Sequence, residues 1–232
     1  MGKLFIVGTP IGNLSDISFR ALETLKSADI ILAEDTRVTQ KLLYHFNIKK
    51  QLISYNEHSS FKIYEKVYDL LLNNKNIALV SDAGTPSISD PGVKLIEFLL
   101  NKNSNIQTIP VPGPSALIAA LSVSGINSDQ FTFLGYPPHK KKRKKFFEQI
   151  QNINVWPVVL YESPHRFLKT LSDLQAVLGP EIFIVICREL TKIYEEIWRG
   201  KLQDAINYFS NKKIQGEFVL VLKNKDNLVS EN

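Results

Sequence analysis

The 232-residue sequence contains a single cysteine, Cys187. One thiol cannot form an intrachain disulfide, and it cannot build the multi-cysteine ligand sets of structural zinc sites. Cys187 lies in the apolar run IFIVIC, which indicates a buried small side chain rather than a nucleophile. The four histidines, at positions 45, 58, 139 and 165, lack the spacing of metal ligands. We therefore expect neither a disulfide-stabilised fold nor a metal site.

Long hydrophobic runs are also missing. No window approaches the roughly 20 apolar residues of a membrane-spanning helix. The apolar run near the start, LFIV, is too short for the core of a signal peptide. We expect a protein of the reducing cytoplasm that has no contact with a membrane.

Two phosphate-binding signatures, G-x-G-x-x-G and G-x-x-x-x-G-K-[ST], do not occur. Three other loops rich in glycine and proline follow apolar runs, at residues 8–13 (GTPIGN), 81–92 (SDAGTPSISDPG) and 111–116 (VPGPSA). Each proline removes an N–H group that a phosphate would use. Such loops suit an uncharged or cationic ligand, for example a nucleoside or a sulfonium, better than a phosphate. Asp82 either accepts hydrogen bonds from this ligand or caps the following turn.

Short β-rich runs alternate with helix-like segments through the first half of the chain, which predicts an α/β domain with a mostly parallel sheet. The second half repeats the theme less regularly, with strands expected near residues 131–135, 158–162, 182–189 and 218–223. The polar stretch SVSGINSD separates the two halves. We predict domains at residues 1–122 and 129–225, followed by a tail at 226–232. The carboxyl ends of parallel strands share one sheet edge, so the three loops are expected to converge on one crevice.

Basic residues are concentrated in the run HKKKRKK, residues 139–145, within a chain of net charge +5. Such a density repels itself unless an anion lies nearby, which favours nucleic acid binding. The alternative is a solvated linker or helix face. The predicted RNA contacts are Lys140, Lys141, Lys142, Arg143, Lys144 and Lys145.

Six segments of the sequence, in their order and spacing, resemble the ribosomal RNA branch of the tetrapyrrole methylase family. They are FIVGTPIGNLSDIS, AEDTR, ALVSDAGTPSISDPG, VPGPSA, YESPHR and RELTK with EEIWRG. The resemblance implies two α/β domains, a mixed sheet in the second, and S-adenosylmethionine bound in a cleft between them. It also implies methylation of the ribose 2'-hydroxyl of a decoding-region cytidine, with 16S ribosomal RNA or the small ribosomal subunit as partner. Together with the frequency of two-fold symmetric enzymes, it predicts a homodimer. The chain departs from the branch at Tyr136, Pro137, Tyr194 and Gln215.

The resemblance also assigns residues to the cofactor. These are Ile11, Asp82, Ala83, Gly84, Ser87, Ile88, Ser115, Ala116, Glu162 and Leu190.

Methyl transfer to a hydroxyl requires an in-line arrangement and removal of a proton. The segments NEHS and ESPHR follow predicted strands, which makes His58 and Glu162 candidate bases and Arg166 a candidate phosphate contact. Alternatively, Ser163 and Pro164 open a helix and His165 merely lies in its first turn. Two other functions remain open. A corrin or precorrin methyltransferase also has anionic substrates, and a noncatalytic RNA-binding protein explains the basic run but not the three loops.

Overall fold

The structure, a computed structural model, describes residues 1–224 and divides into two compact units, Met1–Ser115 and Ala116–Asn232. The predicted tail, 226–232, lies outside the described residues. The sequence-based boundary at 122–129 begins within the last turn of helix α5 (Ala116–Ser124), whereas the structural division falls before this helix. The reason is that α5 packs on strand β10 (Phe218–Leu222) of the second unit.

The first unit is a five-stranded sheet in the order β3-β2-β4-β1-β5, and every strand pair in it is parallel. This confirms the predicted α/β class and parallel sheet. The strands are β1 (Leu4–Val7), β2 (Ile30–Ala33), β3 (Gln51–Ser54), β4 (Ile77–Val80) and β5 (Thr108–Val111). The helices are η1 (Leu14–Asp16), α1 (Phe19–Ser27), α2 (Thr36–His45), α3 (Phe61–Leu72) and α4 (Val93–Lys102).

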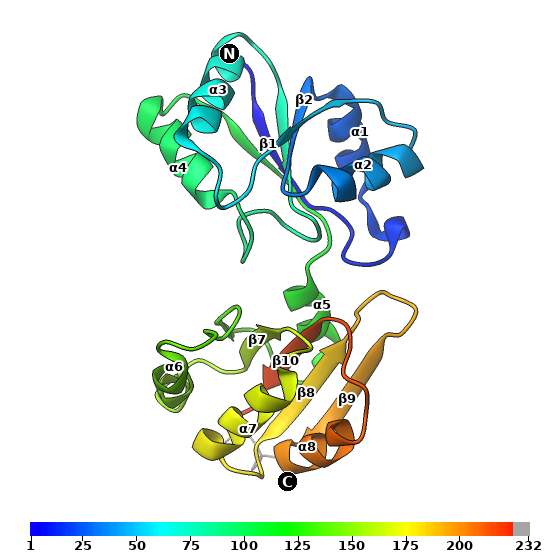
Figure 1. The fold of residues 1–232 in the computed structure, drawn as a ribbon, viewed down its shortest axis with the longest axis vertical. Coiled ribbons are helices and arrows are strands. Elements are labelled where there is room, and N and C mark those ends of the chain that lie inside the picture. The colour runs from blue at the N-terminus through cyan, green and yellow to red at the C-terminus, as the bar shows by residue number, and fades with distance from the viewer. Residues whose placement is uncertain (225–232) are drawn as a thin grey trace. The chain divides into compact units, whose positions relative to one another are not determined.

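Helices cover both faces of this sheet, with α1 and α2 on one side and α3 and α4 on the other (Figure 1). Right-handed crossover connections explain why the helices are divided between the two faces. The chain moves from β1 to β3 in one direction and from β3 to β5 in the other, so the connecting helices change face. Successive strand residues alternate between the two layers: Ile31 packs under α1 and α2, whereas Leu32 packs under α3 and α4.

The second unit contains a mixed sheet, as predicted. Its strand order is β6-β7-β10-β8-β9. Strands β6 and β7 pair in parallel, and the other pairs are antiparallel. The strands are β6 (Thr132–Phe133), β7 (Val158–Glu162), β8 (Phe183–Arg188), β9 (Glu196–Lys201) and β10. The helices besides α5 are α6 (Arg143–Ile150), α7 (Phe167–Leu178) and α8 (Leu202–Ser210).

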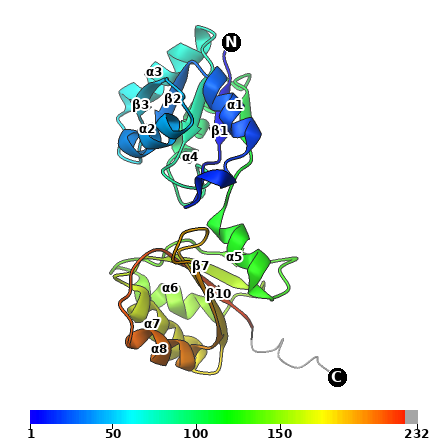
Figure 2. The ribbon, with the colours of Figure 1, turned by 90° about the vertical axis from the view of Figure 1, so that its right-hand side faces the viewer.

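The main core of the second unit lies between the sheet and helices α6, α7 and α8, and α5 covers the opposite face (Figure 2). Phe167 of α7 stacks on Phe218 of β10 with their ring centroids 4.0 Å apart. The edge strand β9 was not expected, because its segment EIWRGK has no buried residue to produce a hydrophobic signal. No helix within residues 1–224 is long and apolar enough to cross a membrane.

Candidate functional site

The loops after β1 and β4 are joined by backbone pairing. Thr9 N donates to Gly84 O at 2.8 Å, and Gly84 N donates to Thr9 O at 3.1 Å. The buried Thr9 hydroxyl also donates to Ser81 O at 3.3 Å. Gly84 has a φ of 81°, a left-handed conformation in which a side chain is strained. The start of the 81–92 loop is therefore held rigidly against the first loop.

The loop after β5 joins the same assembly through a contact between Gly8 and Gly113. A Cβ atom added to Gly8 would lie 2.8 Å from Gly113 Cα, and one added to Gly113 would lie 2.7 Å from Gly8 O. Neither position has room for a side chain. The Thr85 hydroxyl adds a long contact of 3.5 Å to Pro114 O. The three loops converge at the carboxyl edge of the sheet, as the sequence indicated.

The predicted cofactor residues of the first unit lie on this assembly. Ile11 is nearly buried and would lie 3.5 Å from a Cβ added to Gly84. Asp82, Ala83 and Ile88 are exposed, and Ser115 is half-buried at the end of the third loop. Ala116 follows it as the first residue of α5.

Two buried hydroxyls have no hydrogen-bond partner within residues 1–224: Ser87 Oγ in the first unit and Thr191 Oγ1 in the second. Both residues have left-handed backbones, with φ of 74° and 67°. A buried hydroxyl without a partner costs free energy, which a polar ligand can offset. Thr191 directly follows Leu190, a predicted cofactor residue with 8% exposure. Sequence reasoning did not single out Thr191, although it lies in the quoted segment RELTK.

Carboxylates cluster at the same edge of the first sheet. Asp82 Oδ1 accepts from Asp35 N at 2.9 Å, and Glu34 Oε2 accepts from Asp82 N at 3.4 Å. Asp35 forms an ion pair with Arg37 at 2.6 Å. Hydrogen bonds from the side chain and the backbone N–H of Arg37 lower the pKa of Asp35 to about 2. Asp82 thus fastens its loop to the start of α2 while its side chain stays accessible. No group of His, Cys, Asp or Glu side chains in the described residues is arranged to hold a metal ion.

Asp90, from the end of the 81–92 loop, lines a pocket of about 390 Å³ with Glu34, Glu57, Tyr55 and Tyr64. The pKa of Asp90 is raised to about 6, mainly by burial and also by the charges of Glu34 and Asp82, while a hydrogen bond from Ser81 acts in the opposite direction. Burial also raises the pKa of Glu34. His58 lies on the neighbouring turn and is exposed. Its backbone N–H donates to Asn56 Oδ1 at 3.0 Å.

In the second unit, Glu162 is fully engaged at the end of β7. Its carboxylate accepts from Ser163 N at 2.7 Å and from Thr170 Oγ1 at 2.5 Å, and it pairs with Arg166 at 2.8 Å. Arg166 also donates to Pro137 O at 2.7 Å. A buried carboxylate with these partners is a poor general base, and its guanidinium partner is a poor phosphate contact. The geometry therefore argues against the predicted catalytic roles of Glu162 and Arg166.

The alternative role proposed for Ser163 is also wrong. Helix α7 begins at Phe167 with Arg166 at its N-cap, so residues 163–166 form a turn before the helix. His165 lies in that turn and is exposed.

Arg143 differs from the lysines around it. Its side chain is only 7% exposed, and it donates to Asp173 Oδ2 at 2.8 Å, Thr170 Oγ1 at 2.8 Å and Pro138 O at 3.1 Å. The predicted RNA contact of Arg143 is therefore corrected, because its donors are used inside the unit. The five lysines of the run are exposed. Arg143 and Arg166 both hold the loop that carries this run, through the carbonyls of Pro138 and Pro137.

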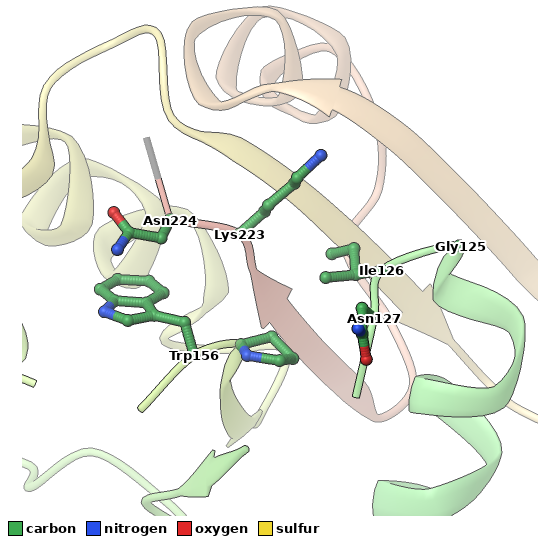
Figure 3. A pocket seen from close by; sticks show the side chains of 7 residues that line it. Gly125, Ile126, Asn127, Trp156, Lys223 and Asn224 are labelled. Carbon is green, nitrogen blue, oxygen red and sulfur yellow. The ribbon is translucent and has the colours of Figure 1, made fainter. Parts of the chain in front are cut away.

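A further pocket, of about 300 Å³, lies at the other end of β7 from Glu162 (Figure 3). It is lined by Gly125, Ile126, Asn127, Trp156, Pro157, Lys223 and Asn224. None of these residues belongs to a predicted site.

Comparison with known proteins defines the class. A family model described as Tetrapyrrole (Corrin/Porphyrin) Methylases matches residues 3–206, so the chain belongs to this family. The predicted family is confirmed.

Individual relatives narrow the comparison. The chain is 48% identical over 222 residues to a Synechocystis sp. protein named ribosomal RNA small subunit methyltransferase I, covering 96% of this chain and 79% of the relative. A Thermotoga maritima protein of the same name is 47% identical over 227 residues, covering 97% and 100%. Among solved structures, a diphthine synthase matches with a TM-score of 0.70 at 14% identity, covering 96% and 90% of the two chains. This last likeness concerns the fold alone.

The first prediction concerns Arg143. Arg143→Ala should lower the free energy of unfolding of the second unit by roughly 2–4 kcal/mol, because it removes the buried hydrogen bonds to Asp173, Thr170 and the Pro138 carbonyl. Lys141→Ala, an exposed neighbour, should change it by less than about 0.5 kcal/mol. Denaturant titration of both variants measures the difference. Equal effects would mean that Arg143 is one more solvated residue of the run.

The second prediction concerns the pH dependence of stability. The pKa of Asp90 in the folded protein is raised from 3.8 to about 6, so the folded state loses stability as pH rises through this interval. Asp90→Asn should therefore stabilise the protein at about pH 8, by on the order of 1 kcal/mol because water partly screens the group. The gain should shrink as pH falls and vanish below about pH 3, where the carboxyl is protonated in both states. A gain independent of pH, measured by denaturant titration, would contradict this account.

Proposed function

We propose that this protein transfers a methyl group from S-adenosylmethionine to the ribose 2'-hydroxyl of a decoding-region cytidine in 16S ribosomal RNA. The observation that carries the proposal is the 47–48% identity, over nearly the whole chain, to proteins named ribosomal RNA small subunit methyltransferase I. The competing corrin substrate is supported by the family's description and by structural neighbours of low identity, such as a uroporphyrin-III-C-methyltransferase at 18%. The substrate we propose is the 16S rRNA or the assembled small subunit.

The converging loops fit the cofactor. S-adenosylmethionine, when bound, supplies an electrophilic methyl group on a cationic sulfur. The exposed Asp82 carboxylate suits its ribose hydroxyls or its ammonium, and the unpartnered Ser87 hydroxyl offers a further polar contact. The glycine contacts and the Thr9–Gly84 pairing fix these loops before binding, so little ordering entropy is lost. The contact between Leu190 of the second unit and the cofactor is still a prediction.

A base is needed because a ribose hydroxyl is a weak acid. Of the candidates, His58 stays the proposed proton acceptor, since its exposed imidazole follows β3 at the carboxyl edge of the first sheet. We do not propose Glu162 as the base, because its buried carboxylate is already bonded to Arg166 and Thr170. Homodimer formation and a cytoplasmic location also stay predictions.

The third prediction tests cofactor and product together. The wild-type protein should bind S-adenosylmethionine without RNA, and Asp82→Ala should weaken binding by about 10-fold to 100-fold through loss of a charged acceptor. Asp69→Ala, which removes an exposed carboxylate on α3, is the matched control and should bind normally. Calorimetry measures both. With unmethylated small subunits as substrate, mass spectrometry of digested RNA should find 2'-O-methylcytidine. Normal affinity in Asp82→Ala, or RNA without the ribose methyl group, would contradict the proposal.

The fourth prediction concerns the exposed lysines of the basic run, which should attract RNA phosphates without contributing to the chemistry. The test protein changes Lys140, Lys141, Lys142 and Lys145 to alanine and keeps the buried Arg143. Its RNA affinity should fall, and its salt dependence should flatten by roughly 0.7 log units for each lost contact to a single strand.

The matched control removes the same charge elsewhere, at the exposed residues Lys26, Lys49, Lys66 and Lys213. Binding titrations at several salt concentrations, with cofactor affinity measured alongside, compare the two proteins. Identical salt slopes would identify the run as a solvated segment.

A further inference from the structure

The acidic pocket at the carboxyl edge of the first sheet adjoins the predicted cofactor residues, because Asp90 lies in the 81–92 loop and Glu34 accepts a hydrogen bond from Asp82 N at 3.4 Å. Its walls come from the loops after β2, β3 and β4, through Glu34, Tyr55 with Glu57, and residues 89–94, together with Tyr64 of α3. None of the predicted cofactor residues lines it. At about 390 Å³ it falls within the size range of small-molecule sites.

The lining of the pocket combines aromatic rings with hydrogen-bond acceptors. The rings of Tyr55 and Tyr64 lie 5.9 Å apart. Burial and the hydrogen bond to Tyr64 raise the pKa of Tyr55, so its hydroxyl keeps its proton. Glu34, Glu57 and Asp90 bring three carboxyl groups, and Lys94 brings one amine. The pocket thus combines aromatic side chains with an excess of hydrogen-bond acceptors.

This chemistry selects one part of an RNA substrate. Carboxylates repel a phosphate, so the group that enters must carry no negative charge and must donate hydrogen bonds. A nucleobase with an exocyclic amine meets both conditions, and enzymes that act on single nucleotides read the edge of an unstacked base in this way. Cytosine presents an N4 amine that Glu or Asp can accept from, whereas uracil presents an O4 acceptor at the same place.

We propose that this pocket holds the base of the target cytidine, with Glu34 and Asp90 accepting hydrogen bonds from its N4 amine. This inference rests on the proposed function and adds to it the residues that choose the base. Both carboxyls line the pocket, and burial together with the charge of Glu34 raises the pKa of Asp90. A hydrogen-bond donor placed between the Glu34 and Asp90 carboxyls offsets the repulsion between them, whereas the O4 acceptor of uracil adds to it.

The experiment compares two substrates, small-subunit RNA with either cytidine or uridine at the position that the wild-type protein methylates. Wild type should favour cytidine by about 10-fold to 100-fold in kcat/KM, the usual discrimination of a good base contact. Glu34→Gln and Asp90→Asn should each reduce this preference several-fold, because an amide can donate to O4 as well as accept from N4. S-adenosylmethionine affinity should change much less than the base preference, because the amide oxygen introduced by Glu34→Gln can still accept from Asp82 N and neither side chain is a predicted cofactor contact.

The matched control is Glu97→Gln, which neutralises an exposed carboxylate on α4 outside the pocket and should keep the wild-type preference. The preference is a ratio, so a loss of folded protein does not alter it. An unchanged cytidine preference in both pocket variants overturns the inference while leaving the proposed function in place. A wild-type protein that methylates no ribosomal RNA overturns the proposed function and the inference with it.

Discussion

The contact between Gly8 and Gly113, together with the backbone pairing of Thr9 and Gly84, is the constraint on which the first unit's site depends. Three strands deliver their loops to one sheet edge, but only glycine lets the loops after β1 and β5 approach to backbone distance. This packing leaves Asp82, Ala83 and Ile88 on the surface and the Ser87 hydroxyl buried without a partner. A rigid scaffold thus presents a small set of polar groups, the usual composition of a ligand site.

The second unit uses charge for a different purpose. Thr170 links Arg143 to Glu162, and Arg166 completes the network, so groups that resemble catalytic and RNA-binding residues in the sequence form a buried support. The network holds the carbonyls of Pro137 and Pro138 and thereby the start of the basic run. The five lysines of the run stay exposed, and Lys144 among them lies 3.8 Å from Glu148.

Much of the fold could be predicted because it is encoded locally: alternating apolar strands and amphipathic helices specify the parallel sheet, and Gly-Pro loops mark its functional edge. Arg143 could not be placed, because a run of six basic residues gives no sign that one of them meets Asp173, thirty positions away. The lone arginine among lysines is a weak clue, since arginine is preferred for buried ion pairs. Glu34 and Asp90 were missed for a similar reason. They lie in the quoted segments AEDTR and SISDPG, but their shared pocket arises only when β2 and β4 pair.

The central claim is that the three converging loops bind S-adenosylmethionine. Hydrogen–deuterium exchange of the full chain, with and without this cofactor, tests it most directly because it reports local opening peptide by peptide. The account predicts slower exchange in peptides covering residues 8–13, 81–92 and 111–116, and no change in the basic run at 139–145. Protection confined to other segments, with these three loops unchanged at saturating cofactor, would contradict it.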